Sequence, residues 1–290
     1  MPLPILLALV SMLAQGASDF LYKKAQDSGI ALESYLLVEA VPFAATALLF
    51  GYLLGDASPN RAALVYGPIF GVFSFCGIFL FVTSLREGEA GVNTLIFRLN
   101  FVLAALIAIL FLGERWTASL GAGLLLAVLA IASVTILGGR RGEGGERGGK
   151  RVRLARPAAL AALAMLFFAV LNIIFKVAVS AGGNVAFLIF FGACAWMVCA
   201  FSVMVARRRF HFPANNWRYL PMTGCLKSVA FFLMLYAFRA GGAASVVVPI
   251  VQLSFLVTVA LAVLFLGERI DRTKGFGLAF ALAALFMLSR

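Results

Sequence analysis

Long apolar stretches separated by short polar connections run along the whole chain. Ten such stretches can be marked, at roughly 2–22, 32–54, 63–85, 91–112, 118–138, 157–179, 184–206, 217–238, 242–266 and 273–289. Each is about long enough to cross a hydrocarbon core of ~30 Å as a helix that rises ~1.5 Å per residue. The runs are continuous and do not alternate with a period of two, so they predict helices rather than barrel strands. The pattern therefore predicts an all-α integral membrane protein with ten transmembrane helices.

One six-residue segment occurs twice, each time at the end of an apolar stretch. The letters LFLGER stand at 110–115 and again, 154 positions later, at 264–269, and a glycine follows each copy at the same distance, Gly121 and Gly275. The two halves therefore read as copies of one unit. Each unit has five helices, an odd number, so the second copy must enter the membrane from the opposite side. We expect two inverted five-helix repeats, an arrangement typical of secondary transporters.

A basic, glycine-rich segment separates the two copies. Residues 139–156 hold six glycines, seven lysines or arginines and two glutamates. Such a segment cannot bury apolar area, so we expect a flexible, solvated linker between a first repeat at 1–138 and a second at 157–290. The connections on the linker's side of the membrane hold 17 of the 24 lysines and arginines. The positive-inside rule therefore predicts a cytoplasmic linker and external termini.

The overall composition agrees with a membrane protein. The chain of 290 residues is 63% hydrophobic and 12% charged, with a mean hydropathy of +1.04, whereas a soluble domain has about 25% charged residues. The first stretch carries Asp19, with Lys23 directly after the stretch, and follows no basic segment, so it does not read as a cleaved signal peptide. The basic residues behind the net charge of +12 lie mainly between the apolar stretches, which indicates membrane orientation rather than a nucleic-acid partner. We expect a multi-pass protein of a prokaryotic inner (plasma) membrane, surrounded by lipid and able to act as a monomer.

Residue types that enzymes need are scarce in this chain. His211 is the only histidine, which excludes a histidine metal cluster and argues against a Ser-His-Asp triad. The four cysteines lie within apolar stretches and lack metal-binding spacing. Nucleotide-binding and metalloprotease motifs are absent from the sequence. We therefore expect no enzymatic activity, no cofactor and no metal site.

Two basic side chains fall deep inside apolar stretches, where a charge costs ~2.5–3.5 kcal/mol on insertion scales. Arg98 lies about seven residues into the fourth stretch. It either binds an anionic or carboxylate-bearing substrate or pairs with Glu39, which lies at a similar depth in the second stretch. Lys227 lies near the centre of the eighth stretch. It either lines a cavity, with Phe231 and Tyr236 along the path, or binds a backbone carbonyl.

A polar stripe marks one side of the first predicted helix. Gln15, Asp19 and Lys23 follow one another at four-residue spacing, and Asp19 aligns with Asn172 of the second repeat. The stripe is either a cavity wall with Asp19 as a proton-binding group, or an Asp19–Lys23 pair near the membrane surface. Apart from Glu33 at the very start of the second stretch, Asp19 and Glu39 are the acidic residues within the apolar stretches, so proton coupling would need one of them to titrate.

Uncharged polar residues extend the set of candidate cavity positions. They are Asn93, Asn100, Asn172, Gln252 and Ser254. Asn93 and Asn100 share one face of the fourth helix. Such groups either line the cavity or form hydrogen bonds between helices. Pro249 removes a ladder bond just before Gln252, and the freed carbonyl either binds a ligand or marks a kink.

The repeated Gly-Glu-Arg motif supplies candidate gates. Gly113 and Glu114 of the first copy, and Gly267 and Glu268 of the second, lie at the junction between the last two helices of each repeat. Each glycine either ends a helix, with the charges facing the membrane interface, or serves as the hinge of a gate. Pro249 is the remaining hinge candidate.

These features resemble the ten-span EamA-type branch of the drug/metabolite transporter superfamily. The resemblance covers nearly the whole chain and rests on the two five-span units, the segment from Gly16 to Lys23 and both L-G-E-R-x(5)-G signatures. It implies a central cavity, lined by spans 1, 3, 4, 6, 8 and 9, that opens alternately to each side. It also implies movement of small metabolites or amino acids, often as efflux. Relatives are commonly drawn with cytoplasmic termini, whereas the charge distribution of this chain favours the opposite orientation.

The function predicted from these observations is an alternating-access secondary transporter that exports a small organic metabolite. Arg98 and Lys227 favour an amino acid or an organic anion as the substrate. Proton-coupled efflux of a cationic drug is the alternative, and it would use Asp19 and Glu39. A non-transporting membrane receptor or scaffold, a pore and a lipid flippase are further alternatives.

Overall fold

Helices make up the regular structure of the protein. The computed structural model describes residues 2–26, 32–55, 58–87, 90–133, 155–208, 219–266 and 272–289. The helices are α1 (Leu3–Gln26), α2 (Leu32–Leu53), α3 (Arg61–Glu87), α4 (Ala90–Arg98), α5 (Asn100–Leu112), α6 (Ala118–Ala132), α7 (Ala155–Ser180), α8 (Val185–Ala206), α9 (Tyr219–Arg239), α10 (Ala244–Gln252), α11 (Phe255–Leu266) and α12 (Arg272–Leu288). The predicted linker at 139–156 lies almost wholly outside the described residues.

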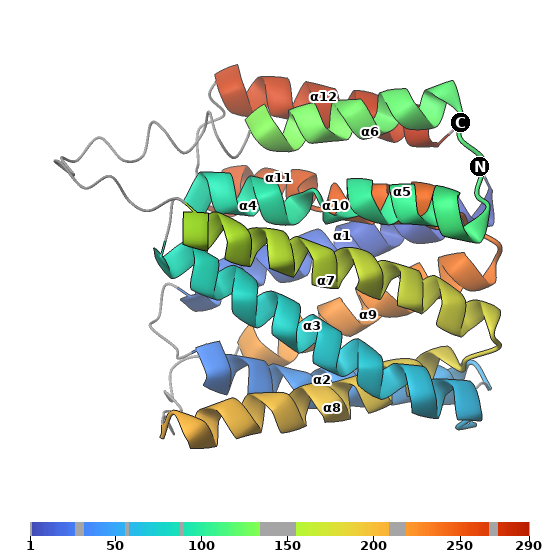
Figure 1. Cartoon of the computed structure of the whole chain (residues 1–290), viewed down its shortest axis with the longest axis vertical. Coiled ribbons are helices and arrows are strands. Elements are labelled where there is room, and N and C mark those ends of the chain that lie inside the picture. Colours follow the sequence, from blue (N-terminus) through green and yellow to red (C-terminus); the bar gives the residue numbers. More distant parts are fainter. Residues whose placement is uncertain are drawn as a thin grey trace, which may run out of the picture.

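The helices lie side by side, and their ends gather at two opposite faces (Figure 1). Both chain termini and the C-terminal ends of α2, α5, α7 and α9 lie at one of them, which we call the terminal face. There Asn60 Nδ2 donates to the Gly182 carbonyl at 2.7 Å and joins the start of α3 to the end of α7. The C-terminal ends of α1, α3, α6, α8 and α11 lie at the opposite face, the linker face. There Arg156 and Glu87 form an exposed ion pair at 3.5 Å.

Among the described residues, eight segments are long and apolar enough to cross a membrane. Two of them, Val92–Leu112 and Ala244–Phe265, each combine two consecutive helices. The predicted fifth and tenth spans correspond to the shorter apolar helices Ala118–Ala132 and Gly275–Leu288. The all-helical, multi-pass character is therefore confirmed, and the number of ten crossings stays a prediction.

The two halves of the sequence interlock. α1 packs on α9, α7 packs on α3, and α2 lies against both α8 and α9. α6 pairs with α12 along one side of the bundle (Figure 1). Since α1 to α3 correspond in chain order to α7 to α9, the α1–α9 and α7–α3 contacts are equivalent. The predicted units 1–138 and 157–290 are therefore divisions of the sequence, because their helices bury each other rather than forming two separate cores.

The fourth and ninth predicted spans are interrupted, although the sequence predicts one continuous helix for each. The first is broken at Leu99, between α4 and α5, and the second at 253–254, between α10 and α11. At the second break the Leu256 N–H bonds to the Leu253 carbonyl, three residues back, at 3.0 Å. This shortened turn leaves the Gln252 carbonyl without its usual ladder donor. Pro249 lacks an N–H group and precedes the turn by four residues, so it weakens the ladder just before it.

Two glycines allow helices of opposite halves to approach each other closely. A Cβ at Gly16 of α1 would lie 2.5 Å from the Ser254 carbonyl oxygen. A Cβ at Gly224 of α9 would lie 2.6 Å from the Glu39 carbonyl oxygen. Glycine therefore lets α1 touch the α10–α11 break and lets α9 touch α2.

Candidate functional site

Arg98 lies at the point where the two interrupted spans meet. Its Nη1 donates to the backbone carbonyl of Gln252 at 3.4 Å, and its guanidinium carbon lies 5.8 Å from the centre of the Phe255 ring. Arg98 and Gln252 are equivalent in the two copies, 154 positions apart. The break of the second half is therefore bound by the side chain at the matching position of the first. The bond is long and a guanidinium has five N–H donors, so Arg98 keeps capacity for another acceptor.

Three amide side chains connect the two breaks to α7. Asn100, which is fully buried at the start of α5, accepts at Oδ1 from Gln252 Nε2 (3.1 Å) and from Asn172 Nδ2 (3.5 Å). Its Nδ2 donates to the Phe97 carbonyl at 2.9 Å. The structure thus brings together three of the uncharged candidates, and their hydrogen bonds are mutual.

Asp19 of α1 is the counterpart of Asn172 of α7, and it contacts the break of the second half. Its two carboxylate oxygens accept from Gln15 Nε2 at 2.9 Å and from Ser254 Oγ at 3.3 Å. The residue is half-buried, and its charge acts on the nearby Arg98. α1 therefore contacts the break of the second half, while Asn172 of α7 contacts the break of the first. The possible Asp19–Lys23 pair lies outside the described side chains.

A three-step ladder joins α2 to α9. The Tyr35 hydroxyl donates to Thr223 Oγ1 at 2.8 Å, Lys227 Nζ donates to both Glu39 oxygens at 3.1 and 3.2 Å, and the Phe43 and Phe231 rings meet edge to face at 5.8 Å. The Glu39 side chain is 4% exposed and that of Lys227 is 24% exposed. The alternative that paired Glu39 with Arg98 is therefore wrong, because α2 packs on α9 and brings Lys227 to the carboxylate.

Tyr35 and Thr223 belong to this ladder and were not among the predicted site residues. Each lies four residues before a charged partner, Tyr35 before Glu39 and Thr223 before Lys227. Matched four-residue spacing on two helices is the signal that could have found them. α1 lies against the same ladder, because Ser18 Oγ donates to the Thr223 carbonyl at 3.1 Å. The next residue, Asp19, contacts the break, so α1 joins the two polar groups.

Two other candidates lie apart from these contacts. Asn93 is buried and donates to the Ser84 carbonyl at 2.7 Å, which fastens α4 to α3. Tyr236 stacks on Phe232 with ring centres 4.8 Å apart, and its hydroxyl accepts from exposed Arg239 near the terminal face. The contacts of Asn93 and Tyr236 are those of helices packed on one another.

Glu114 of the repeated motif caps a helix of the other half. Its carboxylate accepts from the backbone N–H groups of Ala244 and Ser245, at 2.7 and 2.8 Å, at the start of α10. Gly113 ends α5 in the left-handed conformation, with a φ of 69°. The glycine therefore ends the helix, as one alternative held, but the Glu114 carboxylate binds protein rather than facing the interface. Gly267 and Glu268 lie outside the described residues.

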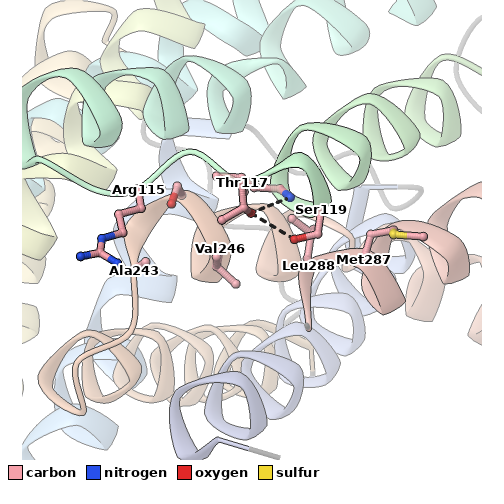
Figure 2. Close-up of a pocket in the computed structure, with 9 residues that line it drawn as sticks. Arg115, Thr117, Ser119, Ala243, Val246, Met287 and Leu288 are labelled. Atoms are coloured by element: carbon pink, nitrogen blue, oxygen red, sulfur yellow. Dashed lines mark hydrogen bonds between the residues drawn. The ribbon is translucent and has the colours of Figure 1, made fainter.

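A cavity of about 290 Å³ lies beside this capped helix start, at the terminal face. Its lining residues are Arg115, Thr117, Ser119, Leu120, Ala243, Ser245, Val246, Met287 and Leu288. Figure 2 shows the Thr117 and Ser119 hydroxyls hydrogen-bonded to each other on one wall and Val246 on the facing α10. The cavity does not include Arg98 or the amide group, whose polar atoms bind one another. Within the described part of the chain, no three His, Cys, Asp or Glu side chains gather as metal ligands.

Comparison with known proteins covers both halves of the chain. The model of the EamA-like transporter family matches residues 2–136 and again 156–290. A solved structure described as "Crystal structure of protein" is similar over 98% of this chain and 95% of its own, with a TM-score of 0.81 and 14% identity. That likeness supports the fold. Comparison with curated proteins finds no match. The doubled family match confirms the resemblance that the repeated motif indicates.

Proposed function

Because this chain belongs to the EamA-like transporter family, we propose that it is a secondary transporter that exports a small organic metabolite by alternating access. Membership of this family indicates that the protein transports small molecules across a membrane. Export, alternating access, the ten crossings and the inverted repeats are parts of the proposal. The predicted absence of enzymatic activity agrees with it.

The observation that carries the proposal is the meeting of two interrupted spans from opposite halves. Discontinuous helices that cross at mid-membrane offer freed carbonyls and helix ends to a solute, and transporters use this arrangement for binding. Here the break of α10–α11 faces Arg98, and Asn100, Asn172 and Gln252 surround it. We therefore assign the substrate site to these residues, together with Asp19, Gln15 and Ser254.

The direction of the helices supports inverted repeats. In Figure 1, α1 starts at the terminal face and ends at the linker face, whereas its counterpart α7 starts at the linker face and ends at the terminal face. Two units of similar structure and opposite direction have two related arrangements of similar energy, which alternating access requires.

Arg98 favours a carboxylate-bearing substrate, an amino acid or an organic anion. Its present protein acceptor is a neutral carbonyl at 3.4 Å, and a substrate carboxylate would form a stronger, charge-assisted pair with a guanidinium. Lys227 already holds the Glu39 carboxylate. It therefore ranks second as an anion-binding group, and its release would need Glu39 to be neutralised or displaced.

The test is transport by purified protein in proteoliposomes, with radiolabelled amino acids and organic acids as probes. Arg98→Ala should lower flux of the transported probe at least tenfold, the effect of losing about one charged hydrogen bond. Arg98→Lys should retain part of it. Arg61→Ala, which removes an exposed arginine at the terminal face, is the matched control and should leave flux unchanged. Equal flux in Arg98→Ala and wild type would remove Arg98 from the site. Saturation with concentration separates a carrier from a pore.

Proton-coupled efflux of a cation remains the second candidate because of Asp19. Its carboxylate oxygens accept from two neutral donors, Gln15 and Ser254, so a cationic solute would find an acceptor there. Cation flux that needs a pH gradient, and that stops in Asp19→Asn but not in Arg98→Ala, would favour this function. Absence of flux for every probe would favour the receptor or scaffold.

The prediction of a prokaryotic inner membrane, with a cytoplasmic linker and a monomer as the working unit, belongs to the same proposal. The cytoplasmic placement of the linker rests on the distribution of basic residues, since 17 of the 24 lysines and arginines are predicted on the linker's side.

A further inference from the structure

Both ends of α10 are held by charged side chains of the first half. At its start, the Glu114 carboxylate accepts from the N–H groups of Ala244 and Ser245 at 2.7 and 2.8 Å. At its end, the Arg98 guanidinium donates to the Gln252 carbonyl at 3.4 Å. An anion at the N-terminus and a cation at the C-terminus both match the helix dipole. α10 is nine residues long, so each end lies within about three turns of the other.

The start of α10 depends on this carboxylate. Its N-cap residue, Ala243, supplies no side-chain hydrogen bond. Without Glu114, the first N–H groups of α10 would lose their acceptor. Lys176 holds the preceding turn, because its ammonium donates to the Gly242 carbonyl. Lys176 and Gly242 both belong to the second half, so at this point it is the Glu114 carboxylate that joins the two repeats.

Space for movement lies beside the same helix start. Ala243, Ser245 and Val246 form one wall of the 290 Å³ cavity, and residues of α6, of the connection just before it and of α12 form the other walls. Figure 2 shows the cavity between these three elements. Ser245 is 1% exposed in this structure, so its side chain is shielded here, and movement of α10 away from Glu114 would expose it.

We propose that α10 is the element that couples substrate binding to opening of the terminal face, and that Glu114 is its positioning residue. This inference rests on the proposed function. A carboxylate that engages Arg98 takes the guanidinium from the Gln252 carbonyl. α10 then loses the cation at its C-terminal end, shifts into the adjacent cavity and leaves Glu114, and the terminal face opens.

Thiol labelling tests the positioning role without a substrate. The background has Cys76, Cys194, Cys199 and Cys225 replaced by alanine, and Ser245→Cys provides the reporter for a membrane-impermeant methanethiosulfonate. Glu114→Gln should raise the labelling rate about tenfold, since charged hydrogen bonds differ from neutral ones by about that factor. Glu114→Asp, which keeps the carboxylate, should raise it less. Glu87→Gln, the same change on an exposed residue at the linker face, is the matched control.

The coupling between the two ends is tested by Arg98→Gln in the same background. It should also raise labelling of the cysteine at 245, although Arg98 binds the far end of α10. Unchanged labelling in Glu114→Gln would overturn the positioning role, and a rise in Glu114→Gln without one in Arg98→Gln would overturn the coupling. Both readouts are independent of transport, so failure of the proposed function leaves them interpretable.

Hydrogen exchange provides a second measurement with the native cysteines in place. The amides of residues 244–252 should exchange faster in Glu114→Gln than in wild type. Ser119→Trp, which fills the cavity beside α10, should slow that exchange again in the double variant. Equal exchange in all three proteins would contradict a mobile α10.

Discussion

Lys227 of α9 binds Glu39 of α2, with the lysine ammonium 3.1 and 3.2 Å from the two carboxylate oxygens. The pair forms the middle step of the Tyr35–Thr223, Glu39–Lys227 and Phe43–Phe231 ladder. Glu39 is almost completely buried, whereas a quarter of the Lys227 side chain is exposed. Each charge therefore compensates the other within the apolar bundle.

Removal of Lys227 should destabilise the protein strongly. Lys227→Met leaves the buried Glu39 carboxylate without its cation, which should lower the free energy of unfolding by about 3 kcal/mol. The double variant Glu39→Met, Lys227→Met should recover most of this loss, since an apolar pair of similar volume replaces a buried ion pair at little cost. Thermal unfolding in detergent measures both. Equal losses in the single and double variants would contradict the pairing, and Arg86→Met, at an exposed helix end, is the control.

Gly224 sets the distance between the two helices of the ladder. Gly224→Ala would place a Cβ 2.6 Å from the Glu39 carbonyl oxygen and 2.7 Å from Pro42, so the helices must separate. We expect a loss of about 1–3 kcal/mol in the free energy of unfolding, the usual effect of overpacking. Gly275→Ala meets nothing within 4 Å and should be tolerated. The same thermal assay compares them, and similar midpoints for the two variants would refute close packing at Gly224.

The helices of this fold could be predicted from apolar run length, but the interruptions could not be placed. Around Leu99 the sequence reads LIFRLNFVLA, without glycine or proline, so no local residue signals the break. In the second half Pro249 does signal a weakness, yet the break comes four residues later, at 253–254. Side-chain contacts support both breaks, because Arg98 donates to the Gln252 carbonyl at the second break and Asn100 donates to the Phe97 carbonyl beside the first.

The candidate site could be predicted as a set of residue types but not as a set of pairs. Depth along a helix placed Arg98 and Glu39 at one level, whereas the direction that each side chain takes depends on which helices are neighbours. Glu114 is a different case, since its partners are backbone N–H groups of the other half. The pattern of side chains along a sequence does not indicate a contact between a carboxylate and the backbone of the other half.

Asn100 and Asn93 should differ in what their loss changes. Asn100→Ala removes the acceptor of Gln252 and Asn172 between the two breaks, so it should lower both stability and substrate flux. Asn93→Ala removes a bond from α4 to the Ser84 carbonyl and should lower stability alone. Each lost hydrogen bond should cost about 1–3 kcal/mol when a buried partner is left unpaired. Thermal unfolding and proteoliposome flux give the two readouts. Normal flux per folded protein in Asn100→Ala would exclude it from the substrate site.

A ligand screen should find stabilisation by carboxylates that depends on Arg98. A ligand at about 100 times its dissociation constant stabilises a protein by ~2.7 kcal/mol, which a thermal shift detects. We expect shifts with amino acids or organic anions in wild type that disappear in Arg98→Ala, because the guanidinium is the cation at the breaks. Arg61→Ala should retain them. Shifts produced only by cations, and unaffected by Arg98→Ala, would instead point to Asp19.

The linker should be cut only from the cytoplasmic side. Residues 139–156 hold seven lysines or arginines, six of them trypsin sites because Arg156 precedes Pro157, and the sequence predicts that they lie on the positively charged side of the membrane. Trypsin should therefore divide the chain into two halves of similar size in inverted vesicles and leave it intact in right-side-out vesicles. Both termini lie at the opposite face, so a tag at either terminus should be removable only in right-side-out vesicles. Linker cleavage in right-side-out vesicles would reverse the assignment of both faces, and with it the side to which opening at Glu114 leads.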